Sequence, residues 1–201
     1  YSFARREQAI WCCSRVTRPN QKRSSLISAR WSFMYPQNPK FHRIKSLGRI
    51  SAFTALTVLF AQLYIDLPGL PVPLTLQTVA VMLTGLYLSP FEAGMVEIFY
   101  LLLGALGFKV FAGRSSGIEK LIGPSFGYFC GFIVSSISLA IILKLKPSIK
   151  QSLLQLFFVL LFASSLILVL GAAWLKDWTS FTSLVFWTAT FIKIVIVLIL
   201  F

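Results

Sequence analysis

Six apolar segments constrain the fold of this chain more than any other feature of its sequence. Most of them approach the roughly 20 residues that a helix needs to cross a bilayer, and only 12% of the 201 residues are charged. A hydrocarbon interior offers the backbone no water to bond, so segments of this kind cross it as helices. The sequence therefore predicts an all-α integral membrane protein, a bundle of six transmembrane helices over residues 47–65, 74–88, 91–107, 124–143, 153–173 and 184–201.

Basic residues gather at the N-terminal end of the chain. Eleven of the 19 lysines and arginines lie within residues 1–49. Membrane proteins keep such charges on the cytoplasmic side, so we predict a cytoplasmic N-terminus and a multi-pass protein of the cell (inner) membrane. The net charge of +13 would also suit nucleic acid. No base-reading or phosphate-cradling motif accompanies it, so we predict no nucleic-acid partner.

Residues 1–40 form a polar, basic tail ahead of a membrane domain predicted at residues 41–201. Its composition, with Glu7 as the single acidic residue, is typical of an organellar transit peptide. It also fits a disordered tail or sequence that is not native coding sequence, because the chain lacks a Met at position 1 and Met34 begins a more sensible reading. We favour the second interpretation.

The sequence contains no catalytic or metal-binding constellation. Cys12 and Cys13 are adjacent in the tail, Cys130 lies in an apolar segment, and His42 is the sole histidine. These residues do not complete a metal-ligand set. The apolar segments also lack a nucleophile with its base and a phosphate-binding Gly-x-x-x-x-Gly-Lys loop. We therefore predict no enzyme activity, no metal and no cofactor.

The stretch Asp66–Thr78 lies between the first two apolar segments and contains Pro68, Pro71 and Pro73. Proline removes a backbone donor and biases the preceding residue away from helix, so no helix runs through it. The stretch is apolar between its prolines, and such a segment at a membrane edge is stable only against protein or over a cavity. The topology places it on the outer face with the glycine-rich loop 108–123. The stretch Asp66–Thr78 is therefore predicted to be a lid over a ligand site.

Lys193 lies inside the last apolar segment, about 9 residues or ~14 Å along the helix. A lysine at that depth costs about 3 kcal/mol on insertion scales and by default indicates a functional site. Glu97, in the third segment, lies at a similar height. Two interpretations stay open: a structural ion pair between Lys193 and Glu97, and a ligand-binding role for Lys193.

Several motifs together resemble the BioY family, the biotin-binding substrate-capture subunits of energy-coupling factor (ECF) transporters. They are Ala61-Gln62, Leu67-Pro-Gly, the run 71–78 (PVPLTLQT), 100–107 (YLLLGALG), 110–113 (VFAG) and 123–128 (GPSFGY). The resemblance implies a six-helix bundle that binds biotin at its outer face beneath the first and third loops. It also implies partners: a separate membrane subunit and two ATPases, contacted partly through small residues of the first helix, here Ser51, Ala52 and Ala55.

The last segment departs from the family pattern, which commonly has Pro-Gly-Asp and a lysine three residues later. This chain keeps Lys193 but has Thr190 in the aspartate position. Threonine can accept a hydrogen bond but brings no charge, so the bond should be weaker. Reduced affinity, compensation by another group such as Glu97, or a relative of biotin as the ligand all stay open.

The resemblance and the loop positions together predict the ligand-binding residues. Lys193 and Thr190 are expected to bond polar ligand atoms, with Gln77 and Tyr100 as further hydrogen-bonding groups. The remaining predictions are apolar walls at Phe111 and Tyr128, a carboxylate partner at Arg114, and close approach at Gly123 and Gly127. The alternatives are a capture subunit for another vitamin, a small membrane enzyme acting on a lipid substrate, and a purely structural membrane subunit.

Overall fold

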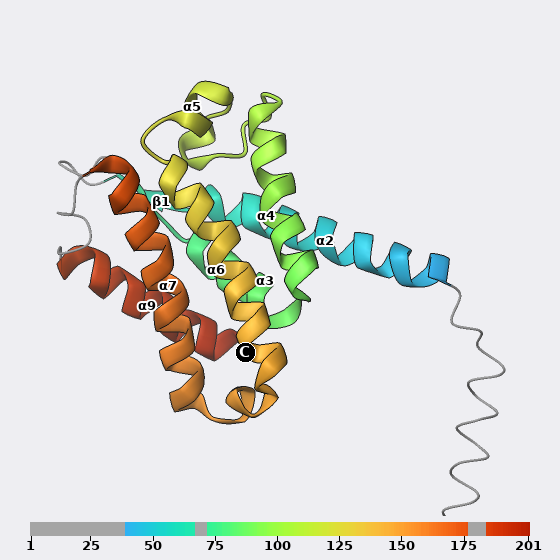
Figure 1. Cartoon of the computed structure of the whole chain (residues 1–201). Coiled ribbons are helices and arrows are strands. Elements are labelled where there is room, and N and C mark those ends of the chain that lie inside the picture. Colours follow the sequence, from blue (N-terminus) through green and yellow to red (C-terminus); the bar gives the residue numbers. More distant parts are fainter. Residues whose placement is uncertain (1–38, 67–71, 177–183) are drawn as a thin grey trace, which may run out of the picture. The chain divides into compact units, whose positions relative to one another are not determined.

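The computed structural model describes residues 39–66, 72–176 and 184–201 (Figure 1). The chain divides into two compact units, residues 1–45 and 46–201. The first helix begins in the first unit, and the other helices, the core and the cavity described below belong to the second. The helices are α2 (Pro39–Ala61), α3 (Gln77–Tyr87), α4 (Pro90–Ala105), α5 (Ile118–Ile122), α6 (Phe126–Leu145), α7 (Leu153–Leu175) and α9 (Leu184–Leu200). The remaining secondary structure of the described residues is two short 3-10 helices, η1 (Ala112–Arg114) and η2 (Pro147–Gln151), and two antiparallel strands, β1 (Tyr64–Ile65) and β2 (Leu74–Thr75).

The prediction of an all-helical membrane protein is confirmed in its class, but not in its helix count. The described residues contain seven α-helices, because the short helix α5 forms within the predicted loop 108–123. Three described segments have the length and apolarity of a membrane span: Arg43–Ala61, Phe126–Leu145 and Leu153–Leu175. The predicted tail at residues 1–40 falls almost entirely outside the described residues.

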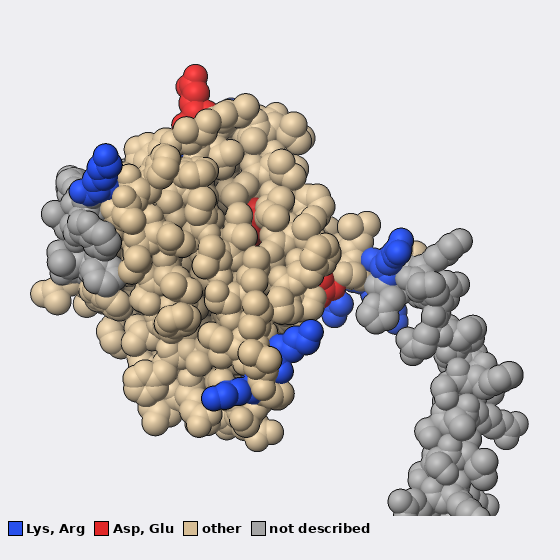
Figure 2. Space-filling view, in the orientation of Figure 1, with Lys and Arg blue, Asp and Glu red and all other residues tan. Residues whose placement is uncertain are grey.

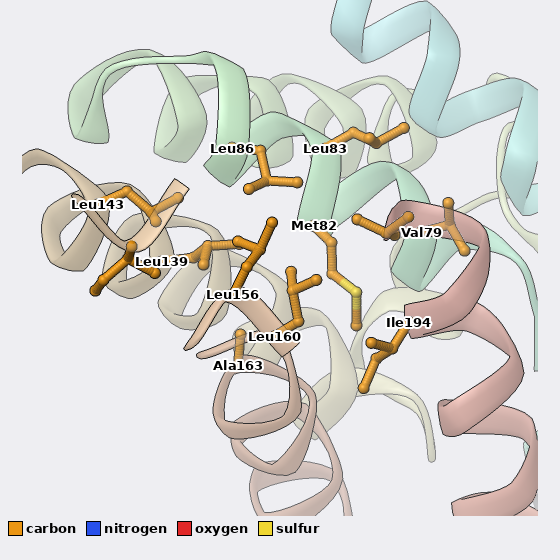
Figure 3. Close-up of a cluster of buried hydrophobic side chains, with 12 residues drawn as sticks. Val79, Met82, Leu83, Leu86, Leu139, Leu143, Leu156, Leu160, Ala163 and Ile194 are labelled. Carbon is orange, nitrogen blue, oxygen red and sulfur yellow. The ribbon is translucent and has the colours of Figure 1, made fainter. Parts of the chain in front are cut away.

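Helix α3 is too short to cross a bilayer in the usual way, since its 11 residues extend about 16 Å. Nine of those residues are buried, so protein surrounds the helix on every side. Its apolar side chains form a core with residues of α6, α7 and α9 (Figure 3). The members labelled there are Val79, Met82, Leu83, Leu86, Leu139, Leu143, Leu156, Leu160, Ala163 and Ile194.

The turn between α3 and α4 is fixed by Ser89 and Glu92. The Ser89 Oγ accepts from the Glu92 backbone N–H, and the Glu92 Oε2 accepts from the Ser89 N–H at 3.1 Å, which together form a capping box. Pro90 occupies the first helical position, where its missing N–H has no cost. Arg49 of α2 then pairs with Glu92, Nη2 to Oε1, at 2.6 Å. The tight connection at Ser89-Pro90 therefore also anchors α2.

The surface of the unit 46–201 is largely apolar. Figure 2 shows a face on which acidic and basic side chains are sparse. Exposed large apolar side chains come from every described α-helix of this unit, for example Leu102, Val134, Phe158, Phe162 and Ile192. An exposed apolar surface of this extent requires lipid or protein to cover it. With several apolar spans, it identifies a multi-pass membrane protein.

Candidate functional site

A cavity opens between the strand β2, the start of α3, the loop 111–125 and the helices α6, α7 and α9. About 790 Å³ of space lies between its walls when the open mouth is counted. Its lining residues are Val72, Pro73, Leu74, Thr75, Gln77, Thr78, Phe111, Ala112, Lys120, Ser125, Tyr128, Phe129, Phe132, Ser164, Ile167, Leu168, Phe186, Thr190 and Lys193.

The described part of the predicted lid lies at this cavity. Val72, Pro73 and Leu74 line it directly. The strand β2 pairs with β1, with Tyr64 opposite Thr75, so the two ends of the proline-rich stretch are held together as a hairpin. Residues 67–71, with Pro68 and Pro71, lie outside the described residues.

Lys193 reaches the cavity from α9 and bonds a threonine of α3. Its Nζ donates to the Thr78 Oγ1 at 3.2 Å. The predicted alternative of an ion pair with Glu97 is wrong, because Glu97 instead contacts the Thr84 hydroxyl at 3.3 Å. Glu97 also lies outside the cavity lining, so it cannot compensate there for the missing aspartate. Lys193 therefore keeps ammonium hydrogens available for a ligand.

Thr190 lines the cavity one helical turn before Lys193, and only 6% of its surface is exposed. Its Oγ1 donates to the Phe186 carbonyl of its own helix at 2.7 Å. A hydroxyl has one hydrogen and two lone pairs, so the Thr190 oxygen can still accept a hydrogen bond but has none to give. Toward a ligand, Thr190 is an acceptor.

Gln77 and Tyr100 form a hydrogen-bonded pair, of which only Gln77 lines the cavity. The Tyr100 hydroxyl donates to the Gln77 Oε1 at 3.4 Å. The Gln77 Nε2 is buried and has no hydrogen-bond partner within the part of the chain that the structure describes. Tyr100 itself lies outside the cavity lining, so the structure brings its hydroxyl to Gln77 and not directly to the cavity.

Aromatic side chains form the apolar wall, as predicted for Phe111 and Tyr128. The Phe111 ring stacks on Phe129 with centroids 5.1 Å apart, and Tyr100 meets its edge at 5.6 Å. Gly104 of α4 makes this packing possible, because a Cβ there would lie 2.0 Å from the Phe111 Cζ. The carbonyls of Val110 and Phe111 accept from the Gln62 Nε2 at 3.0 and 3.3 Å, which holds the loop down.

Besides Tyr100, three predicted contacts are not brought to the cavity: Arg114, Gly123 and Gly127. Arg114 is exposed on η1. Gly127 serves packing between helices, since a Cβ there would lie 2.4 Å from the Leu170 carbonyl oxygen of α7. The Gly123 carbonyl accepts from the Trp174 indole at 3.1 Å.

The sequence reasoning did not single out Lys120, Ser125, Ser164 or Phe186, all of which line the cavity. The loop 108–123 contains three cations, Lys109, Arg114 and Lys120, and only the fold distinguishes Lys120 from Arg114. The lining thus contains two lysines and, among its described residues, neither aspartate nor glutamate. An apolar pocket with two ammonium groups and unmatched donors suits an anionic ligand that also carries acceptors.

The small residues predicted to contact a partner lie on one exposed stripe of α2. Ser51, Ala52 and Ala55 are all exposed. Small side chains at this spacing let another helix approach closely. The structure leaves that stripe uncovered within the unit 46–201.

Comparison with known proteins relates the chain to one family. Residues 32–201 match the BioY family. The chain is 34% identical to the biotin transporter BioY2 of Lactococcus lactis subsp. cremoris over 79% of this chain and 86% of that protein. It is 40% identical to a probable biotin transporter of Pyrococcus horikoshii over 47% of this chain, and this alignment spans only 57% of the relative.

A solved structure shares the fold. It is the S-component for biotin from an ECF-type ABC transporter, with a TM-score of 0.70 and 27% sequence identity. The match covers 83% of this chain and 92% of the other.

Proposed function

Because the chain belongs to the BioY family, we propose that it is a substrate-binding subunit that captures biotin at the outer face of the membrane for uptake. Biotin is an apolar bicycle with a polar ureido edge and a carboxylate tail. The observation that carries the proposal is the character of the cavity: aromatic walls, two lysines and no acidic side chain among the described lining residues. Such a pocket suits a small apolar monoanion. The protein acts as a binder and not as an enzyme.

The ureido ring would lie at the α3–α9 side of the cavity. Lys193 and the Gln77 amide offer hydrogens there, and Thr190 offers an acceptor. A ureido group needs this combination, since its carbonyl accepts and its two N–H groups donate. The apolar bicycle would then pack on Phe111 and Tyr128.

The carboxylate would bond Lys120, with Ser125 beside it, in place of the Arg114 predicted from the sequence. Both residues line the cavity, whereas Arg114 does not. Lys120 is exposed on α5, which packs against α4 and α6, while Lys193 is partly buried on α9 against α3 and α7 (Figure 1). The carboxylate, the most strongly hydrated group of the ligand, would thus meet Lys120, which is the more exposed of the two lysines.

The proposed topology has α2, α3, α4, α6, α7 and α9 in the membrane, a cytoplasmic N-terminus and a location in the cell (inner) membrane. A separate ECF membrane subunit would contact the stripe of Ser51, Ala52 and Ala55, and two ATPase subunits would power uptake. The exposure of that stripe supports a contact there.

Thr190 favours one second candidate, a capture subunit for another vitamin. A neutral acceptor in place of a carboxylate should hold a ureido N–H less tightly. The test is retention of labelled biotin by the purified full chain in detergent, challenged with unlabelled vitamins one at a time. Displacement by unlabelled biotin alone supports biotin capture. Failure to retain biotin, with saturable retention of another labelled vitamin, would contradict biotin capture and support a capture subunit for that vitamin.

A further inference from the structure

Tyr100 is fully buried on α4 and lies outside the cavity lining, yet its hydroxyl bonds a residue that faces the cavity. It donates to the Oε1 of Gln77, which begins α3 and is 3% exposed. The Tyr100 ring packs edge-on against Phe111 and Phe129. Any effect of the hydroxyl on a ligand must therefore pass through Gln77.

The hydroxyl decides which end of the Gln77 amide is left for the cavity. A side-chain amide has an accepting oxygen at one end and two donor hydrogens at the other. With its oxygen on Tyr100, the Gln77 Nε2 remains, and that atom has no hydrogen-bond partner among the described residues. In the opposite orientation the amide would donate to the Tyr100 oxygen, and the Tyr100 hydrogen would lose the acceptor that it has now. The observed arrangement instead leaves the unmet donor at the cavity.

We propose that Tyr100 is a positioning residue that locks the Gln77 amide with its NH₂ toward the ligand, so that the site selects a ligand with an acceptor at that point. This inference rests on the proposed function, in which the acceptor is the ureido oxygen of biotin. An analogue that presents a donor there, such as 2-iminobiotin with its imino group in place of the oxygen, is disfavoured by the same lock.

The test is a double-mutant cycle on biotin affinity, measured with the purified full chain in detergent. The variants are Tyr100→Phe, which keeps the ring and its packing, Gln77→Met, which keeps the side-chain length, and the two combined. We expect Tyr100→Phe to raise the biotin Kd about three- to tenfold, the effect of one hydrogen bond. In the Gln77→Met background it should have no further effect. Tyr87→Phe, the same change at a half-exposed position on α3, is the matched control.

A second readout separates positioning from packing. When the lock is removed, the amide can rotate, so the ratio of 2-iminobiotin Kd to biotin Kd should fall in Tyr100→Phe and stay at the wild-type value in Tyr87→Phe. An equal loss of biotin affinity from Tyr100→Phe in both backgrounds, or an unchanged affinity, overturns the inference while the proposed function stands. A wild-type chain that binds no biotin overturns the proposed function and this inference with it.

Discussion

Replacing Gly104 with alanine should disturb the aromatic wall of the cavity without touching the ligand directly. Gly104 lies on α4, and a Cβ at that position would stand 2.0 Å from the Phe111 Cζ and 2.4 Å from its Cε1. Carbon atoms in ordinary contact are about 3.5–4.0 Å apart. The Phe111 ring must therefore withdraw by about 1.5–2 Å, and with it the loop that Gln62 holds through the Val110 and Phe111 carbonyls.

The size of the effect follows from the cost of overpacking. Extra atoms in a well-packed core cost about 1–3 kcal/mol, and alanine in a helix interior returns up to about 1 kcal/mol relative to glycine. A net 1–2 kcal/mol expressed in binding corresponds to an increase of about five- to thirtyfold in the biotin Kd. The reason is that Phe111 lines the cavity, so its displacement changes the surface on which the ligand packs.

The assay is a biotin titration of the purified variant in detergent, with its thermal midpoint measured in parallel. Gly94→Ala is the matched control on the same helix, because a Cβ there meets only the flexible end of Ile137, at 2.9 Å from its Cδ1. We expect its biotin Kd to stay within about twofold of wild type, since Ile137 lies outside the cavity lining. Wild-type affinity and stability in Gly104→Ala would refute the placement of Phe111 in the wall.

Three further predictions follow from the site and the α3–α4 turn. Lys120→Gln should weaken biotin binding about tenfold, through loss of a charged hydrogen bond, and leave the binding of neutral biotinamide unchanged. Arg114→Gln should change the binding of neither ligand. A loss of biotin binding in Arg114→Gln alone would show that Arg114, and not Lys120, bonds the carboxylate. Thr190→Asp should tighten biotin binding about tenfold by supplying a charged acceptor, and weaker binding in a titration would contradict the acceptor role. Glu92→Gln should lower the free energy of unfolding by at most about 1 kcal/mol, because its partner Arg49 is half exposed; equal biotin affinity in this variant checks that the turn is remote from the site.

The sequence predicted the helical class because apolar length is a property of each segment by itself. The capping box of Ser89 and Glu92 is a local feature as well, since it involves only residues within one helical turn. Helix α5 was not predicted, because five residues among glycines and serines show no helical period. Close approach was predicted at Gly127, but which element approaches it, here α7, depends on tertiary packing.

Site residues were predictable where one side chain is out of place in its surroundings, and not where several are alike. Lys193 stood out as a charge in an apolar helix. Its depth along the helix suggested Glu97 as a partner. Depth does not say from which side of the helix a side chain projects, and in the structure Lys193 bonds Thr78 instead. Arg114 and Lys120 are equivalent by composition, and only the fold shows that Lys120 lines the cavity.

The most direct test of biotin capture is a calorimetric titration of the purified full chain with biotin, beside its Lys193→Met variant. We predict saturable binding of one biotin per chain by the wild type. The variant should keep the wild-type helical circular dichroism and bind about 10- to 100-fold more weakly, because it loses a charged hydrogen bond inside the cavity. Equal affinity in the two proteins, or no saturable binding by the wild type, would contradict the account.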